Sequence, residues 1–222
     1  MVNPTPINSA KTKVSEAIRA ALGIFISAGS VAELRVIDAD SGNGFGKTYS
    51  GYFNDLDQMA TQAAKFDGKA PAVYFTVNPC SEALLARAAN RTRAVKKEPL
   101  TADHDIARRS WFMIDVDPVR PKGISSTDEE HTYAQRKAAD IRDYLTSLGW
   151  PLPVVADSGN GGHLNYRVDL PNDKEAAELI KAVLGALSDR FSDDRAEIDR
   201  TVFNAARIWK LYGTSAKKGD ST

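Results

Sequence analysis

The spacing of hydrophobic residues changes several times along this chain and predicts a mixture of helices and strands. In some segments apolar residues recur every three to four positions, as on one face of a helix, whereas others are short runs rich in β-branched and aromatic residues, as in strands. Residues 1–10 are polar and are predicted to form a loose lead-in. The predicted helices cover residues 13–28, 55–66, 82–89, 127–148 and 172–187, and the predicted strands cover residues 31–39, 49–53, 71–77, 111–118, 153–157, 163–168 and 206–213.

Capping residues predict where several helices begin. Thr127 and Glu130 have the spacing of a capping box, in which each side chain bonds to the backbone of the other residue. Asn54 and Asn172 stand where an N-cap is expected, because an asparagine side chain can accept a hydrogen bond from the first turn of a helix.

The strand predicted at Trp111–Pro118 ends in two acids. Side chains alternate along a strand, so Asp115 and Asp117 project to the same side with Cα atoms roughly 6 to 7 Å apart. Two carboxylates this close repel each other unless a cation lies between them, so the pair predicts a Mg²⁺ or Mn²⁺ site. Sugar-nucleotide transferases, nucleases and polymerases all use such a pair. The alternative is a pair of surface acids at a strand-to-loop junction.

The turn Ser158-Gly-Asn-Gly-Gly-His163 predicts a phosphate-binding site. Glycines such as Gly159 let the backbone direct its N–H groups toward an anion, and the Ser158 hydroxyl and the His163 imidazole add further donors. A plain hairpin needs fewer glycines and no histidine.

Other charged residues extend this chemistry. Asp199 can supply a third carboxylate, and Arg207 and Lys210 can neutralise a triphosphate or a template. Strict alternation would put Arg207 and Lys210 on opposite faces of a strand, so both can line one site only if there is a bulge or if the strand is shorter than predicted.

A basic cluster precedes the acidic strand. Dense lysines and arginines are usually a solvated face, but next to a metal site they can bind a nucleic-acid backbone. The residues that we assign to such a contact are Arg91, Arg93, Lys96, Lys97 and Arg109.

The segment Ser41–Thr48 ends in Gly-Lys-Thr, like a phosphate-binding P-loop. However, the glycine expected five residues before Gly46 is a serine, and a strand follows where a P-loop requires a helix. We therefore predict a glycine-rich β-hairpin turn.

Composition limits the classes of protein that fit. The 222 residues are enough to bury a substantial core, and 29 basic residues balance 29 acidic ones, so nucleic-acid binding has to come from local patches. The single cysteine, Cys80, excludes an internal disulfide and fits a reducing compartment. No segment has the length of a membrane span or the apolar core of a signal peptide, so we expect a cytoplasmic protein with no membrane partner.

Three motifs, taken in order, resemble those of the archaeo-eukaryotic primase superfamily, and most of all the primase-polymerases of bacteria, phages and plasmids. They are the strand ending in Asp115-x-Asp117, the turn Ser158–His163, and Ile198-Asp199 followed by Arg207 and Lys210-Leu-Tyr-Gly-Thr214. The resemblance covers about half of the chain, residues 108–214.

The resemblance implies an α+β fold, the primase catalytic core, in which an N-terminal α/β unit packs against a C-terminal RRM-like half with a mixed or antiparallel sheet. Residues 11–107 would form the first part and residues 108–214 the second, within one catalytic domain spanning residues 1–222. Residues 215–222 would be a tail that can lead into a further domain. The active site would lie between the two parts, and the strands predicted above agree with this arrangement.

The resemblance also implies roles for individual residues. Asp115, Asp117 and Asp199 match the catalytic carboxylates that hold two Mg²⁺ or Mn²⁺ ions. The residues that match or accompany the contacts to the incoming nucleotide are Ser158, Gly159, His163, Arg207, Lys210 and Lys217. The implied activity joins dNTPs or NTPs to a primer or to an initiating nucleotide on a single-stranded DNA template, and proteins with this activity can have a helicase, fused or separate, as a partner.

Two other functions fit parts of the same pattern. A non-catalytic replication initiator or single-stranded nucleic-acid-binding module would bind a template, but it would leave the three aspartates unexplained. A metal-dependent nuclease could use the same Asp-x-Asp pair. Rolling-circle nucleases usually carry two histidines separated by one hydrophobic residue, whereas His104, His131 and His163 are isolated.

Overall fold

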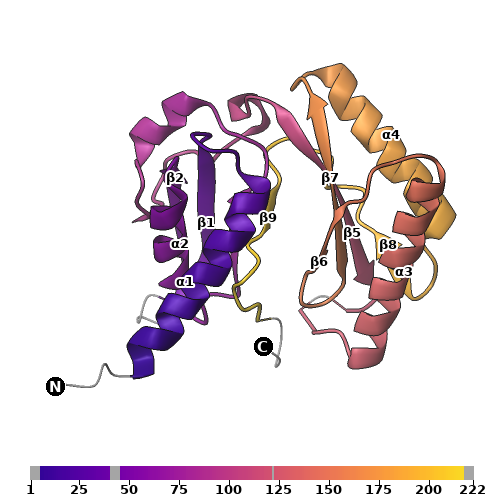
Figure 1. Ribbon diagram of the computed structural model, residues 1–222, viewed down its shortest axis with the longest axis horizontal. Helices are drawn as coiled ribbons and strands as arrows, with labels where there is room; N and C mark the ends of the chain where they lie inside the picture. The colour runs from indigo at the N-terminus through magenta and orange to yellow at the C-terminus, as the bar shows by residue number, and fades with distance from the viewer. Residues whose placement is uncertain (1–5, 41–45, 122, 218–222) are drawn as a thin grey trace.

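Two antiparallel sheets with helices packed against them make up the fold (Figure 1). The structure is a computed structural model and describes residues 6–40, 46–121 and 123–217. The α+β class expected from the sequence is confirmed. The helices are α1 (Pro6–Phe25), α2 (Leu56–Ala64), α3 (Asp128–Ser147), α4 (Lys174–Phe191) and the short 3₁₀ helices η1 (Glu82–Arg87) and η2 (Asp103–Asp105); the strands are β1 (Ala32–Asp40), β2 (Gly46–Phe53), β3 (Ala72–Thr76), β4 (Arg93–Ala94), β5 (Arg109–Pro118), β6 (Val154–Asp157), β7 (Gly162–Leu170), β8 (Ala196–Ile198) and β9 (Ile208–Lys210).

The first sheet has the strand order β4-β2-β1-β3-β9. Its central hairpin pairs Ala32 of β1 with Phe53 of β2, and β3 pairs with the other side of β1. The last strand, β9, returns from the far end of the chain and pairs Trp209 with Phe75 of β3. Residues 208–210 therefore belong to the same sheet as the N-terminal strands, which differs from the division at residue 108 that the resemblance implied.

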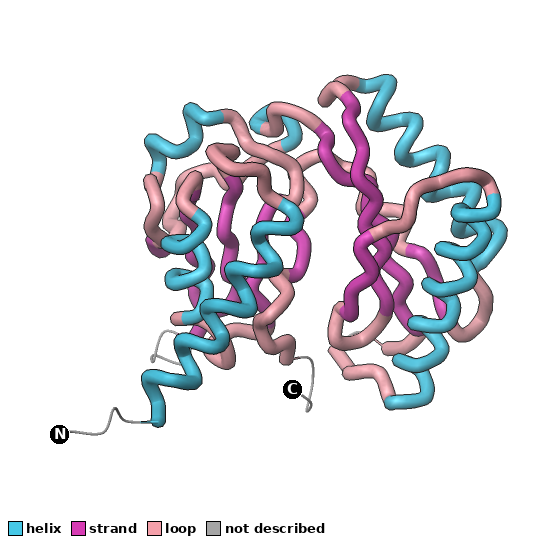
Figure 2. The backbone as a smooth tube through the Cα atoms, in the orientation of Figure 1, coloured by secondary structure: helices cyan, strands magenta, loops and turns pink. Residues whose placement is uncertain are grey.

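The second sheet is formed by a β-α-β-β-α-β unit, β5-α3-β6-β7-α4-β8, with the strand order β6-β7-β5-β8. The two central strands, β5 and β7, come from separate parts of the unit and pair Asp115 with His163. Helices α3 and α4 lie on the outer side of this sheet, as the tube in Figure 2 shows, so its other face is turned toward the first sheet.

Alternation along β5 separates the two sides of this strand. Phe112 packs toward Trp150 and Tyr166, with ring centroids 5.9 and 6.3 Å away. Trp111 packs in the opposite direction, where its ring lies 4.8 Å from that of Phe25 and its indole N–H donates to the Phe25 carbonyl at 2.9 Å. Since Asp115 and Asp117 share the side of Trp111, both acids face the first sheet.

The capping box at Thr127 and Glu130 is present as predicted, with reciprocal hydrogen bonds between side chain and backbone. At two other helices the predicted cap is displaced by one residue: Asp55 caps α2 and Asp173 caps α4. In both cases the preceding asparagine is used elsewhere. Asn54 pairs with Asn90, and Asn172 donates to the carbonyls of Asp103 and Ile106.

Three further expectations needed correction. The segment 6–10, predicted as part of a loose lead-in, belongs to α1, and the helix predicted at 82–89 is the shorter 3₁₀ helix η1. The strand predicted at 206–213 is limited to β9, residues 208–210. The β-hairpin predicted around Ser41–Thr48 is supported by the pairing of β1 with β2, while residues 41–45 lie outside the described ranges.

Among the helices that the structure describes, none is long and apolar enough to cross a membrane.

Candidate active site

Asp115, Asp117 and Asp199 lie on one side of the same pocket, and we call them the acid wall. The first two are on β5. Asp199 follows β8, whose antiparallel register with β5 pairs Ile198 with Val116, and the Asp199 N–H donates to the Asp115 carbonyl at 3.0 Å. The short strand β8 therefore brings Asp199, which is distant in sequence, directly beside Asp115 and Asp117.

The three carboxylates differ in their contacts. Asp199 accepts the Thr201 N–H at 2.7 Å and lies 3.7 Å from the guanidinium of Arg207. Asp117 lies 3.7 Å from Arg120. Asp115 Oδ1 is buried without a hydrogen-bond partner, although His163 Nε2 is 3.2 Å away, because that pair lacks hydrogen-bond alignment. In the described ranges, the side chains form no cluster of three or more acidic, histidine or cysteine groups poised to hold a metal ion.

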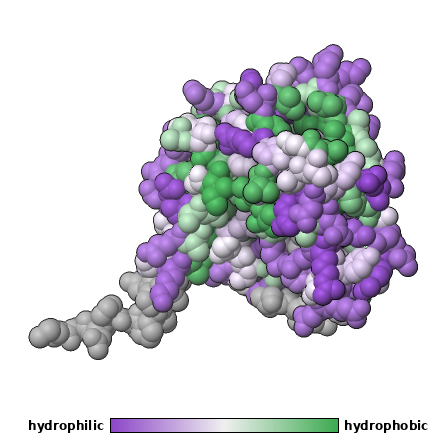
Figure 3. All heavy atoms as spheres, turned by 45° about the vertical axis from the view of Figure 1, so that its right-hand side comes forward, coloured by the Kyte–Doolittle hydropathy of each residue, from purple (hydrophilic) through white to green (hydrophobic). Residues whose placement is uncertain are grey.

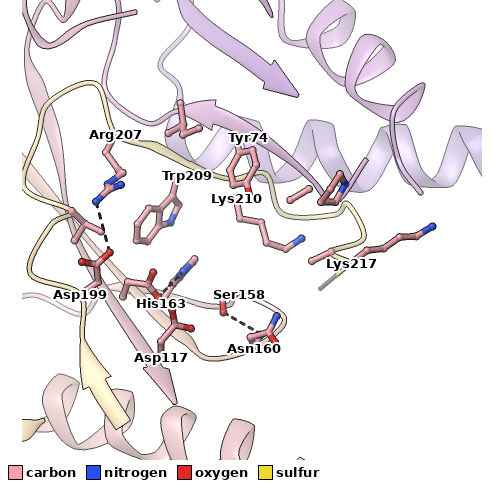
Figure 4. Close-up of a pocket in the computed structure, with 16 residues that line it drawn as sticks. Tyr74, Asp117, Ser158, Asn160, His163, Asp199, Arg207, Trp209, Lys210 and Lys217 are labelled. Atoms are coloured by element: carbon pink, nitrogen blue, oxygen red, sulfur yellow. Dashed lines mark hydrogen bonds and ion pairs between the residues drawn. The ribbon is translucent and has the colours of Figure 1, made fainter. Parts of the chain in front are cut away.

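Arg207, Lys210 and Lys217 line the same pocket from the side of the first sheet, and we call them the cation wall (Figure 4). Arg207 lies just before β9 and Lys210 ends it, so the shortness of this strand allows both side chains to line one pocket. Burial lowers the pKa of Lys210, whose ammonium donates to the Thr214 carbonyl at 2.8 Å. Lys217 donates to the Gly68 carbonyl at 2.8 Å.

The turn between β6 and β7 is built around its own hydrogen bonds. The Gly159 N–H donates to the Asp157 carboxylate at 2.6 Å, and the N–H groups of Asn160 and Gly161 donate to the Ser158 hydroxyl oxygen at 3.2 and 2.8 Å. These N–H groups are therefore not open to an anion, contrary to the nest expected from the glycines. The Ser158 side chain still lines the pocket, whereas Gly159 lines a neighbouring cavity.

His163 is held between the two sheets. The residue is nearly inaccessible, at 4% exposure, and its ring packs against Trp209 of β9 with centroids 4.1 Å apart and planes tilted by 32°. Nδ1 is 2.7 Å from the Tyr212 hydroxyl, while Nε2 is the atom beside Asp115. The histidine thus joins the acid wall to β9, the strand that ends at Lys210.

The pocket has a volume of about 340 Å³, within the usual range for small-molecule sites. A second cavity, of about 530 Å³, adjoins it and shares Lys210. Two exposed apolar residues, Ile24 and Val155, line this second cavity. Figure 3 shows green apolar patches that interrupt the polar surface on one side of the molecule.

Tyr74, Asn160 and Trp209 are among the residues of the pocket wall that were not predicted from the sequence. Asn160 stood within the predicted turn but was given no role; here its side-chain oxygen accepts the Ser126 N–H at 3.0 Å. Tyr74 and Trp209 lie in apolar runs, where an aromatic residue ordinarily predicts core packing, so no local signal distinguished them.

The basic cluster lies away from the pocket. Arg93 belongs to β4, at the opposite edge of the first sheet from β9, so four inter-strand steps, roughly 19 Å, separate the two edges. Arg93 also lies 3.4 Å from Glu98 in an exposed ion pair. Arg91, Lys96 and Lys97 are at least partly exposed.

Arg109 does not belong to this exposed surface. It is only 4% exposed, and its guanidinium donates to the Phe203 carbonyl at 2.7 Å. Burial lowers its pKa, with Asp103 and Asp173 acting in the opposite direction. The assignment of Arg109 to nucleic-acid contact is therefore wrong for the described structure, in which it supports the loop before β9.

Comparison with protein-family models, with curated proteins and with solved structures gives no match for this chain.

Proposed function

We propose that this chain is a template-dependent nucleotidyltransferase, a DNA primase-polymerase that joins nucleoside triphosphates to a primer by two-metal phosphoryl transfer. The observation that carries the proposal is that the acid wall and the cation wall line one pocket. A nucleoside triphosphate bound with divalent ions needs carboxylates for the ions and cations for its phosphates. The pocket offers both, and they come from two different sheets.

The state of Asp115 supports the metal part of the proposal. Its Oδ1 atom is buried and lacks an aligned hydrogen-bond donor, which costs free energy that a bound cation would offset. A donor set of carboxylate oxygens suits Mg²⁺ or Mn²⁺. Asp115, Asp117 and Asp199 would hold the two ions, which when bound would lower the pKa of the primer 3′-hydroxyl and neutralise charge on the phosphates.

The chain's own cationic and hydroxyl groups would position the triphosphate. Arg207, Lys210 and Lys217 line the pocket together with the acid wall, and Ser158 and His163 add polar groups at its side. Little covalent chemistry is required of the protein in phosphoryl transfer, so the rate depends on holding the α-phosphate in line with the attacking hydroxyl. Fixed charges in a partly enclosed pocket meet that requirement.

The architecture is consistent with the same proposal. The β5-α3-β6-β7-α4-β8 unit has the topology expected of an RRM-like half, and the first sheet corresponds to the N-terminal unit. The pairing of β9 with β3 departs from the implied division of the chain, but it is what places the cation wall in the same pocket as the aspartates.

A labelled primed template, incubated with the protein and Mn²⁺ with and without dNTPs or NTPs, tests the proposal. We expect template-directed lengthening of the primer that requires both nucleotide and metal. Shortening of the DNA in the absence of nucleotide would instead indicate a nuclease, and a mobility shift without any change of length would indicate a binding module; either result would contradict the proposal.

The exposed basic cluster is proposed to contact the backbone of the single-stranded template at a distance from the pocket. Replacing Arg91, Arg93, Lys96 and Lys97 by glutamine should weaken binding to single-stranded DNA and flatten its salt dependence, with the slope falling by about 0.7 for each phosphate that is no longer neutralised. Nucleotide affinity should stay the same, since β4 and β9 are on opposite edges of the sheet. Fluorescence anisotropy over a salt series measures both. An unchanged slope would make the cluster an ordinary solvated face.

A further inference from the structure

The hydroxyl group of Tyr212 is the centre of a hydrogen-bond network behind His163. The indole N–H of Trp209 donates to it at 2.9 Å, and the side-chain amide of Asn165 donates to it at 3.3 Å. The same hydroxyl is 2.7 Å from His163 Nδ1. His163 connects this network to the acid wall, since its Nε2 lies 3.2 Å from Asp115.

The orientation of the Asn165 amide is fixed by a second contact. Its nitrogen lies 3.2 Å from the carbonyl oxygen of Val154, which can only accept a hydrogen bond. The amide NH₂ group therefore supplies one hydrogen to Val154 and the other to Tyr212. The direction of the hydrogen bond between Trp209 and Tyr212 is unambiguous, because the indole nitrogen can only donate.

These contacts determine which group donates between Tyr212 and His163. A tyrosine hydroxyl has two lone pairs and one hydrogen. Trp209 and Asn165 occupy both lone pairs, so the hydroxyl hydrogen is directed at His163 Nδ1, which must accept it. A neutral imidazole that accepts at Nδ1 carries its own hydrogen on Nε2.

We propose that Tyr212 is a positioning residue that holds His163 in the tautomer with its hydrogen on Nε2, on the side of Asp115. The ring of Trp209, packed against the imidazole with centroids 4.1 Å apart, limits its rotation, and the Tyr212 hydroxyl fixes which nitrogen donates. Burial raises the pKa of Tyr212, which keeps the hydroxyl protonated as this arrangement requires.

The consequence for the pocket rests on the proposed function. An Nε2–H group can donate to a phosphate oxygen or to the Asp115 carboxylate, whereas the other tautomer would present a lone pair to these anions and repel them. Since the contact between Nε2 and Asp115 is 3.2 Å but poorly aligned, the donor is available to a phosphate that enters beside Asp115. Tyr212 would thus act on the nucleotide through His163 without touching it.

Nitrogen-15 NMR of the free protein tests the tautomer without metal or nucleotide. The chain has three histidines, so the signals of His163 are identified by their loss in His163→Gln. At a pH where the spectrum shows neutral imidazoles, we expect His163 to carry its hydrogen on Nε2, and we expect Tyr212→Phe to populate the form with hydrogen on Nδ1. A wild-type His163 with its hydrogen on Nδ1, or a tautomer unchanged in the variant, would overturn the proposal.

Trp209→Phe provides a second variant, in case Tyr212→Phe is poorly folded. It retains an aromatic ring over the imidazole but frees one lone pair of Tyr212, so the hydroxyl can accept from Nδ1–H and the tautomers should again mix. If Tyr212→Phe is folded and the His163 tautomer is unchanged in both variants, the Tyr212 hydroxyl does not control the tautomer. Thermal unfolding of each protein shows whether it is folded.

Activity gives an independent readout. Tyr212→Phe should lower kcat/KM for nucleotide incorporation roughly 10- to 100-fold, as is typical when the partner that orients a site residue is removed. Tyr144→Phe removes a hydroxyl from the distant helix α3 and should leave the rate unchanged. If the wild-type protein incorporates no nucleotide, the proposed function fails, while the NMR result still decides the role of Tyr212.

Discussion

Replacing Asp115 by asparagine should reduce nucleotide incorporation by at least about 10²-fold and leave the protein folded. Loss of a group that merely supports a metal ligand costs roughly 10- to 100-fold, and loss of a ligand should cost more. The side chain keeps its shape in this variant, and the packing of β5 around Ile114 and Val116 does not involve the carboxylate. Asp117→Asn should behave in the same way, because both acids line the same pocket.

Primer extension with Mn²⁺ measures the rate, and calorimetric titration with Mn²⁺ measures the metal affinity. In Asp115→Asn both the rate and the metal affinity should fall. The matched control is Asp143→Asn, an exposed acid on α3 that forms an ion pair with its neighbour Arg142. It makes the same chemical change away from the pocket and should keep full activity. Normal extension by Asp115→Asn would remove the aspartates from the mechanism.

Replacing Gly161 by alanine should destabilise the protein by about 3 kcal/mol, the upper end of the usual cost of overpacking. A Cβ atom at this position would lie 2.1 Å from the Val116 carbonyl oxygen. That oxygen belongs to the backbone of β5, so no side chain can rotate away to relieve the contact. The turn would have to move, and with it Ser158, whose hydroxyl accepts the Gly161 N–H.

The corresponding fall in melting temperature is roughly 6 to 12 °C for a chain of this size. Gly185→Ala is the matched control, because it makes the same substitution within α4, where a Cβ atom would meet nothing within 4 Å. Alanine is the better helix former, so this variant should gain up to about 1 kcal/mol. Equal melting temperatures for Gly161→Ala and the wild type would show that the turn does not sit tightly on β5.

The parts of this structure that the sequence predicted are those specified by residues close together in the chain. The apolar run before Asp115 predicted β5, and the spacing of Thr127 and Glu130 predicted the start of α3. The turn between β6 and β7 was also predicted, since glycines between two apolar runs permit little else. The alternation along β5 further predicted that Asp115 and Asp117 share a face, which follows from strand geometry alone.

The parts that were missed depend on contacts between distant residues. Strand β8 has three residues, too few for a pattern, and it exists because its backbone pairs with β5. Arg109 was assigned to nucleic-acid contact because it immediately precedes the acidic strand, next to the basic cluster, yet it is buried where the Phe203 carbonyl can accept its hydrogen bond. The caps Asp55 and Asp173 could not be distinguished from the asparagines before them without knowing that those asparagines bond elsewhere.

In the candidate site, too, the features that depend on local sequence were predicted and those that depend on distant contacts were not. The acids and the Ser158–His163 turn follow from local sequence, whereas the separation of the basic cluster from the pocket depends on the order of strands in a sheet. The network behind His163 includes Trp209 and Tyr212, and nothing in the sequence indicates that these two aromatic residues bond to one another and to the histidine. Which groups bond to the Tyr212 hydroxyl depends on side chains that are close in space, and the spacing of residues in the sequence does not predict it.

The late arrival of β9 has a consequence for how the chain is made. A ribosome releases the N-terminal strands first, so the outer edge of β3 stays without its partner until residues 208–210 have emerged. During that interval the aspartates on β5 can already be in place, but Arg207, Lys210 and Lys217, which line the same pocket, have not yet been synthesised. The nascent protein would therefore carry an incomplete pocket with an excess of negative charge, and nucleotide affinity should appear only after these three cations have been added.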